Sequence, residues 1–304
     1  VSRQVFDGRA RSSAMGEMAE DRVYDERRGE TVAYLATGEG VATVRVSSDR
    51  VGRFSLAERC RARDVATATD PTGDGRVFAA TDEGVLAGPD PFEPVGFGAS
   101  VAVGTDAEGT PLAADSDGAV ARYRDGEWTP LGTIKDVRAI EGGFVAAADG
   151  VFRVDGDDLA PVGLADVRDV TSAGAPLAAT DDGLYRLGNG WLREREGRFT
   201  VVATAGGRTA ATDDGASDGA SGGGPAHAAT ADSLFAREAG GEWEPVALPT
   251  DEPVADVAYG ECPYVVTERG TFLIDADPER TPDGAGGWRS RSLGLPDVVA
   301  LAVA

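Results

Sequence analysis

A strand–turn–strand unit recurs along the chain, and this repeat constrains the fold more than any other feature. The stretch "PLAATDDGLYRL" has an apolar strand, an acidic turn with glycine, and a second strand. The same pattern is present in "YLATGEGVATVRV", "VFAATDEGVLAG", "PLAADSDGAVARY", "FVAAADGVFRV", "AHAATADSLFARE" and "YVVTERGTFLI". Glycine at such a turn favours a β-hairpin, because it supplies the positive φ that the hairpin twist requires. A repeat built only from short strands predicts a β-propeller or a similar array.

Each hairpin is flanked by two further strands. The turn positions are 32 to 50 residues apart and are occupied by Gly40, Gly84, Gly118, Gly150, Gly183, Ser233 and Gly270. An apolar stretch, often opened by Asp-Val as in "DVATAT", precedes the hairpin, and a stretch such as "EWTPLG" follows it. Four strands per repeat is the size of one propeller blade.

The first hairpin has no preceding strand in the matching position, whereas the chain ends with an extra one, "PDVVALAVA". We expect Asp297 to Val303 to supply the innermost strand of blade 1, because closing the ring removes exposed sheet edges. The sequence therefore predicts an all-β, seven-bladed β-propeller with four antiparallel strands per blade, closed by its C-terminal strand.

The predicted propeller is one domain over residues 21–304. Residues 1–20 have no repeat pattern and are expected to form a flexible N-terminal extension. The Gly/Ser/Asp-rich stretch at about 213–226 is predicted to be a flexible insert between the first two strands of blade 6.

The chain is strongly acidic, with 52 acidic and 29 basic residues, a net charge of −23 and Lys135 as its one lysine. Such a surface argues against nucleic acid and anionic membranes as partners. No apolar run reaches the length of a membrane span, and the basic N-terminal residues precede no hydrophobic segment, so we expect a cytoplasmic protein. The composition resembles that of proteins from archaea with a high-salt cytoplasm, where the Debye length is about 3 Å at 1 M salt and dense carboxylates are tolerated.

Carboxylates recur where the innermost strands begin, and this set is the strongest candidate site. Aligning the repeats on Asp-Val gives five aspartates, with Ser100 and Thr200 in the other two blades: Asp64, Asp136, Asp169, Asp256 and Asp297. Because the innermost strands line the propeller axis, we expect this set to ring the mouth of the central channel.

Three interpretations of the ring are open. Each aspartate can accept hydrogen bonds from backbone N–H groups at the strand entry, a structural role that a repeated turn favours. Some of the ring can instead bind Ca²⁺ or Mg²⁺ through oxygen ligands; no other cofactor is expected. Paired carboxylates can also perform acid/base chemistry, as in glycosidases.

Other chemically capable side chains have simpler structural interpretations. Arg63, Arg138 and Arg168 flank the strand entries, where they either pair with carboxylates or hold an anionic ligand. The four tryptophans are near the starts of outer strands and are expected to pack between blades. His227, the single histidine, is expected in a surface loop. Cys60 and Cys262 lack zinc-site spacing, and they are expected on opposite faces without a disulfide.

The stretches "VYDERRGETVAYLATGEGV" and "GRFSLAERCRARDVA" resemble an uncharacterised family of haloarchaeal β-propeller proteins. The resemblance covers nearly all of the chain after about Met18 and brings no catalytic motif with it. The chain lacks the Trp-Asp signature, the kelch double glycine and a complete sialidase Asp-box. We therefore predict a monomeric, non-catalytic binding or scaffolding propeller with a protein or small ligand at the channel-mouth face. The alternative is a cation-dependent hydrolase, or another enzyme, that uses acidic residues at the same mouth.

Overall fold

The computed structural model describes residues 30–47, 50–69, 75–206, 224–276 and 287–304. The predicted N-terminal extension at 1–20 lies outside these residues, as does most of the predicted insert. Ala226, which we placed at the end of the insert, is instead the first residue of a buried strand and pairs with Thr204. Among the described residues, no helix has the length and apolarity needed to span a membrane.

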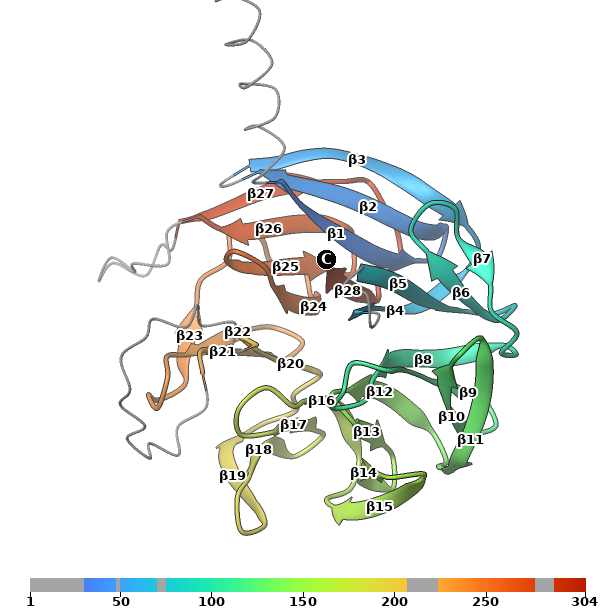
Figure 1. Ribbon diagram of the computed structural model, residues 1–304. Helices are drawn as coiled ribbons and strands as arrows, with labels where there is room; N and C mark the ends of the chain where they lie inside the picture. The colour runs from blue at the N-terminus through green and yellow to red at the C-terminus, as the bar shows by residue number, and fades with distance from the viewer. Residues whose placement is uncertain (1–29, 48–49, 70–74, 207–223, 277–286) are drawn as a thin grey trace, which may run out of the picture.

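The described strands form seven four-stranded antiparallel sheets around a central axis (Figure 1). Within each blade the strands are A to D from the axis to the rim. Blade 1 consists of β28 (Ala300–Val303), β1 (Glu30–Thr37), β2 (Gly40–Ser47) and β3 (Arg50–Arg59). Blade 2 consists of β4 (Ala62–Thr69), β5 (Gly75–Thr81), β6 (Val85–Gly88) and β7 (Glu93–Pro94), and blade 3 of β8 (Ser100–Thr105), β9 (Pro111–Asp115), β10 (Ala119–Arg124) and β11 (Glu127–Thr133).

The remaining blades follow in chain order. Blade 4 consists of β12 (Val137–Glu141), β13 (Phe144–Ala147), β14 (Gly150–Asp155) and β15 (Asp158–Gly163), and blade 5 of β16 (Val167–Thr171), β17 (Leu177–Thr180), β18 (Gly183–Leu187) and β19 (Trp191–Glu196). Blade 6 consists of β20 (Val201–Thr204), β21 (Ala226–Ala229), β22 (Leu234–Arg237) and β23 (Glu244–Val246), and blade 7 of β24 (Val254–Tyr259), β25 (Pro263–Thr267), β26 (Thr271–Asp275) and β27 (Trp288–Ser292).

The C-terminal strand closes the ring as predicted, but it begins at Ala300 and not at Asp297. β28 pairs antiparallel with β1, in a register that runs from Ala33 opposite Val303 to Ala36 opposite Ala300. The end of the chain is beside the centre of the ring in Figure 1. The fold prediction of seven blades with this closure is confirmed.

The core consists of one apolar cluster at each of the seven blade boundaries, among the described residues. Successive side chains of a strand point to opposite faces of its sheet, so one strand serves two boundaries. In β1, Ala33 and Leu35 pack towards blade 7, whereas Tyr34 and Ala36 pack towards blade 2. This arrangement explains why the second strand of each repeat is almost continuously apolar.

The turns between strands B and C depend on a repeated threonine. Thr81 Oγ1 donates to the Gly84 carbonyl oxygen at 2.7 Å and accepts from the Gly84 N–H at 3.0 Å. Gly84 has a φ of +154°, and a Cβ there would lie 2.6 Å from the Phe97 carbonyl oxygen. The glycine is therefore required both by the backbone conformation and by the close approach of the next turn.

Candidate functional site

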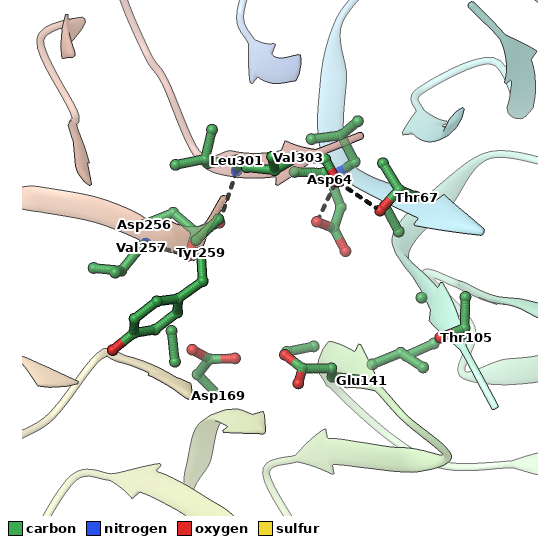
Figure 2. Close-up of a pocket in the computed structure, with 18 of the residues that line it drawn as sticks. Asp64, Thr67, Thr105, Glu141, Asp169, Asp256, Val257, Tyr259, Leu301 and Val303 are labelled. Atoms are coloured by element: carbon green, nitrogen blue, oxygen red, sulfur yellow. Dashed lines mark hydrogen bonds between the residues drawn. The ribbon is translucent and has the colours of Figure 1, made fainter. Parts of the chain in front are cut away.

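Four carboxylates line the central channel, in a cavity of about 350 Å³ bounded by the innermost strands. They belong to Asp64 on β4, Glu141 on β12, Asp169 on β16 and Asp256 on β24. Figure 2 shows the four residues around one central space. Tyr259, three threonines and small or apolar residues, most of them on the innermost strands, complete the lining.

A β-bulge near the start of the innermost strand positions each channel aspartate. In blade 2 the register shifts between Ala62 and Asp64, so that Arg63 is the extra residue and Asp64 is opposite Ala80. The same shift precedes Asp169 and Asp256. Because a bulge re-aims the side chains next to it, the aspartate after the bulge faces the axis.

Both carboxylate oxygens of each channel aspartate accept a backbone hydrogen bond. Asp64 Oδ1 accepts from the Val65 N–H at 2.8 Å, and its Oδ2 accepts from the Val103 N–H of blade 3 at 2.9 Å. Asp169 accepts from Val170 and from Val202 of blade 6, both at 2.8 Å.

Asp256 completes this set at the closure of the ring. It accepts from Val257 and from Leu301 of blade 1, both at 2.7 Å. Each aspartate therefore ties its own strand to the innermost strand of the next blade, at the boundaries 2/3, 5/6 and 7/1. This geometry matches the structural interpretation of the aspartates, in which they satisfy backbone donors at the strand entry.

The protein environment favours the protonated form of these carboxyl groups. Burial raises the pKa of Asp64 to about 7 and that of Asp256 to about 8, despite the lowering effect of the backbone hydrogen bonds. Burial raises the pKa of Asp169 well above its ordinary value, and the Asp256 carboxylate adds to that effect. Like charges that share a cavity disfavour the ionised forms of one another.

Glu141 belongs to the channel but was missed in the sequence. Its Oε1 accepts from Thr171 Oγ1 at 2.8 Å and from the Ser172 N–H at 3.2 Å, which links blades 4 and 5. The channel wall partly shields this carboxyl group from water and so raises its pKa, although the Glu141 side chain is exposed. The available signal was its spacing: Glu141 is two residues after Ala139, the residue that follows the bulge in blade 4, and residues two apart share a strand face.

Asp136 and Asp297 do not belong to this set, which corrects the ring of five. Both are exposed, neither lines the cavity, and both have left-handed backbone, with φ of +53° and +52°. Their carbonyl oxygens accept from Ala148 and Gly38 in the neighbouring B–C turns. Asp136 precedes the bulge of its strand and lies three residues before Ala139, which takes the position equivalent to Asp64. Asp297 likewise lies three residues before Ala300, the first residue of β28.

Ser100 and Thr200, which take the place of aspartate in blades 3 and 6 of the predicted ring, also lie outside the channel lining. Ser100 is buried before the bulge of its strand, and Ala102 occupies the position equivalent to Asp64. Thr200 precedes β20, where Val201 takes the equivalent position opposite Ala229. Neither side chain therefore contributes a polar group to the channel.

The three flanking arginines share one structural position, the extra residue of the bulge. Arg63 Nε is 2.6 Å from Asp82 Oδ1, and Arg168 forms two hydrogen bonds with Asp181. Arg138 donates to the Val167 carbonyl oxygen at 3.0 Å. These contacts match the pairing interpretation for Arg63 and Arg168, and the Arg168 guanidinium lowers the pKa of the Asp181 carboxyl group.

The tryptophans contact the preceding blade, as expected for packing residues. Trp128 Nε1 donates to the Val95 carbonyl oxygen and Trp191 Nε1 to that of Val162, while Trp243 Nε1 donates to Glu194 Oε2. Trp288 meets the His227 ring edge-on.

His227 is not in a surface loop, which corrects that expectation. It is buried within β21 at 4% exposure, and its Nδ1 is 2.6 Å from the Tyr259 hydroxyl. Both residues also line a cavity of about 1060 Å³ across blades 6, 7 and 1, together with Cys262.

Cys60 and Cys262 are free thiols, and burial raises the pKa of the Cys262 thiol to about 11. A thiol with so high a pKa is a poor nucleophile.

Within the described part of the chain, no group of three or more His, Cys, Asp or Glu side chains is placed to hold a metal ion. The channel carboxylates line one cavity, and both oxygens of the three aspartates, with Oε1 of Glu141, accept backbone or threonine hydrogen bonds that join neighbouring blades.

A match to a family model identifies the family of the chain. A family model described as "Beta-prop_HVO_0234:-like, beta propeller" matches residues 17–304. The chain belongs to this β-propeller family. Its resemblance to a haloarchaeal propeller family is thereby confirmed. None of the curated proteins compared with the sequence matches it.

Solved structures share the fold at low sequence identity. The computationally designed protein Ika8 is 14% identical with a TM-score of 0.55, over 88% of this chain and 86% of that chain. The WD40 β-propeller domain of Doa1 is 15% identical with a TM-score of 0.56, over 76% of this chain and 82% of that chain. At these identities the likeness concerns the fold alone.

Proposed function

We propose that the protein is a non-catalytic binding or scaffolding propeller, with a protein partner or small ligand at the channel-mouth face. One observation carries this proposal: both oxygens of Asp64, Asp169 and Asp256 are occupied by backbone N–H groups. Each of these hydrogen bonds uses one lone pair of a carboxylate oxygen and fixes the carboxylate to the backbone of two neighbouring blades. The three aspartates therefore have a structural role, which favours a binding propeller over an enzyme.

The channel-mouth face, formed by the B–C turns and the D-to-A connections, has features that suit binding. The hydroxyls of Thr37, Thr81 and Thr180 each bond the glycine that ends their turn, so the turns are held in one conformation. A preorganised surface loses little conformational entropy when a partner docks. Val299, in the connection that leads into blade 1, is 48% exposed on this face.

The composition supports a setting for this function. We place the protein, as a monomer, in the cytoplasm of a salt-loving organism, because its 52 acidic residues and single lysine suit molar salt. Most of the negative charge then keeps the protein soluble in molar salt. A partner would be recognised by the local shape and chemistry of the channel-mouth face.

The test compares two variants, each with two Asp→Asn substitutions, in a capture experiment from a native high-salt lysate. The mouth variant carries Asp136→Asn and Asp297→Asn, which change exposed turns. The channel variant carries Asp64→Asn and Asp169→Asn. We expect the mouth variant to lose a partner that the wild type and the channel variant retain, with the contact mapped by hydrogen exchange of the complex. Loss of the partner only with a folded channel variant, or no partner with any of the proteins, would contradict the proposal.

The alternative of a cation-dependent hydrolase or another enzyme has one supporting observation. Carboxyl groups with raised pKa values in a cavity are typical of acid/base sites as well as of buried structural networks. Calorimetric titration with Ca²⁺ and Mg²⁺ in molar KCl separates the two functions. Saturable binding that Asp169→Asn and Asp256→Asn abolish would favour the enzyme, whereas the binding propeller gives no saturable heat.

A further inference from the structure

The strand that closes the ring is held from both sides. On one side β28 pairs with β1 over four residues. On the other side the Leu301 N–H donates to Asp256 Oδ2, while Asp256 Oδ1 accepts from Val257 in the same blade as Asp256. Figure 2 shows this link between β24 and β28 at the edge of the channel.

We propose that Asp256, together with the other channel carboxylates, forms a proton-linked clamp on the ring-closing strand β28. The ionised carboxylate is the better acceptor for the two N–H groups, because charge strengthens such hydrogen bonds. The same charge is unfavourable in a channel that partly shields it from water and brings further acids close. The clamp therefore balances stronger hydrogen bonds against an unfavourable buried charge.

The groups that face Asp256 determine which effect is larger. They are Asp64 from β4, Glu141 from β12 and Asp169 from β16, with Tyr259 from its own strand. His227 of β21 reaches this region through its hydrogen bond with Tyr259. The described lining of the channel cavity contains no arginine, lysine or histidine side chain. Four acidic groups thus share the space without a basic partner in that lining.

The direction of the effect follows from where the proton is bound. Burial raises the pKa of Asp256 from 3.8 to about 8, so the closed ring binds this proton more tightly than the open or unfolded chain does. Between about pH 4 and pH 8 the closed state therefore holds more protons. A raised folded-state pKa contributes stability that is fully present below the unfolded value and is lost as the pH rises towards 8. Closure of blade 7 onto blade 1 is expected to weaken as the pH rises from about 4 to about 8, with no further loss from this group at higher pH.

The first test follows the backbone amide of Leu301 by NMR in 2 M KCl, from pH 6 to pH 9.5. An N–H bonded to a titrating carboxyl group changes its chemical shift as the proton leaves. We expect the amides of Leu301 and Val257 to titrate together with a midpoint near pH 8, and Asp256→Asn to remove both titrations. This measurement on the wild type does not require any variant to fold. Amides of Leu301 and Val257 that do not titrate in this range would overturn the proposal.

The second test measures the urea midpoint of unfolding over the same pH range and salt concentration. We expect the wild-type midpoint to fall as the pH rises, and Asp256→Asn to make that fall smaller. Asp136→Asn is the matched control, because it makes the same substitution in an exposed left-handed turn that asparagine tolerates. An equal fall in the wild type and in Asp256→Asn would overturn the clamp. High salt limits the contribution of the acidic surface.

Discussion

One dipeptide, Asp-Val, has two different roles in this chain, and a single backbone feature separates them. Asp64 follows a β-bulge and lines the channel, whereas Asp136 precedes one and is exposed. The stretch "ADVRDV" contains both kinds, since Asp166 has left-handed backbone at a φ of +50° and Asp169 lines the channel. The role of an aspartate at the start of an innermost strand therefore depends on its position relative to the bulge, and not on the residue that follows it in the sequence.

Removing a channel aspartate is expected to destabilise the fold. Asp64→Ala leaves the N–H groups of Val65 and Val103 without their acceptor, at about 1–3 kcal/mol for each buried donor that stays unsatisfied. Water in the channel can replace part of this loss, so we expect a loss of about 2–4 kcal/mol in the free energy of unfolding, measured by urea denaturation.

Glu83→Ala is the control for this prediction, because it removes an exposed acid from the B–C turn of the same blade. Surface changes of this kind usually stay within about 0.5 kcal/mol. Equal unfolding free energies for the two variants would show that the Asp64 carboxylate does not link blades 2 and 3.

At the scale of single elements, the hairpin turns were predictable from the sequence and the bulges were not. A strand ending in threonine, followed three residues later by glycine, identifies the turn in "ATDEG" and "ATDDG" directly. A bulge inserts one residue without a characteristic side chain: Arg63, Val101 and Ala255 all occupy that place. The ring predicted from the sequence therefore combined aspartates that follow the bulge with aspartates at the preceding turn, and it did not include Glu141.

The turn threonine is expected to contribute measurably to blade stability. Thr81→Val keeps the side-chain shape but removes the hydroxyl that contacts Gly84 and accepts from the Glu83 N–H. We expect a loss of about 1–2 kcal/mol from the unmade hydrogen bonds, measured by thermal or urea unfolding. Thr43→Val, which removes an exposed cross-strand hydroxyl contact with Ser55, is the control and should cost less than about 0.5 kcal/mol. A Thr81→Val variant as stable as this control would contradict the role of the turn.

At the scale of the whole molecule, the number of blades and the closure of the ring could be predicted from the sequence. Seven hairpins and one unmatched C-terminal strand leave few arrangements that bury every sheet edge near the axis. The contacts across blade boundaries were not predictable, because they join residues far apart in the chain. The link between Thr67 and the Val303 carbonyl oxygen joins blades 2 and 1 across 236 residues.

The acidic surface is expected to make stability depend on salt. With a net charge of −23, self-repulsion acts over about 10 Å at 0.1 M salt but over only about 3 Å at 1 M. We expect the melting temperature to rise between 0.1 M and 2 M KCl, measured by circular dichroism. Sucrose, which adds no ions, serves as the control for general exclusion effects. A melting temperature that stays constant or falls with KCl would contradict this view of the surface.

The central claim is that each channel aspartate holds the innermost strand of the next blade, and amide hydrogen exchange tests it most directly. The three donors are the N–H groups of Val103, Val202 and Leu301, which bond Asp64, Asp169 and Asp256 respectively. Each aspartate is replaced by alanine in turn, and exchange is followed at all three amides in molar KCl. We predict that each variant loses protection at its own amide while the other two stay protected. Unchanged exchange at the matching amide in all three variants would contradict the account.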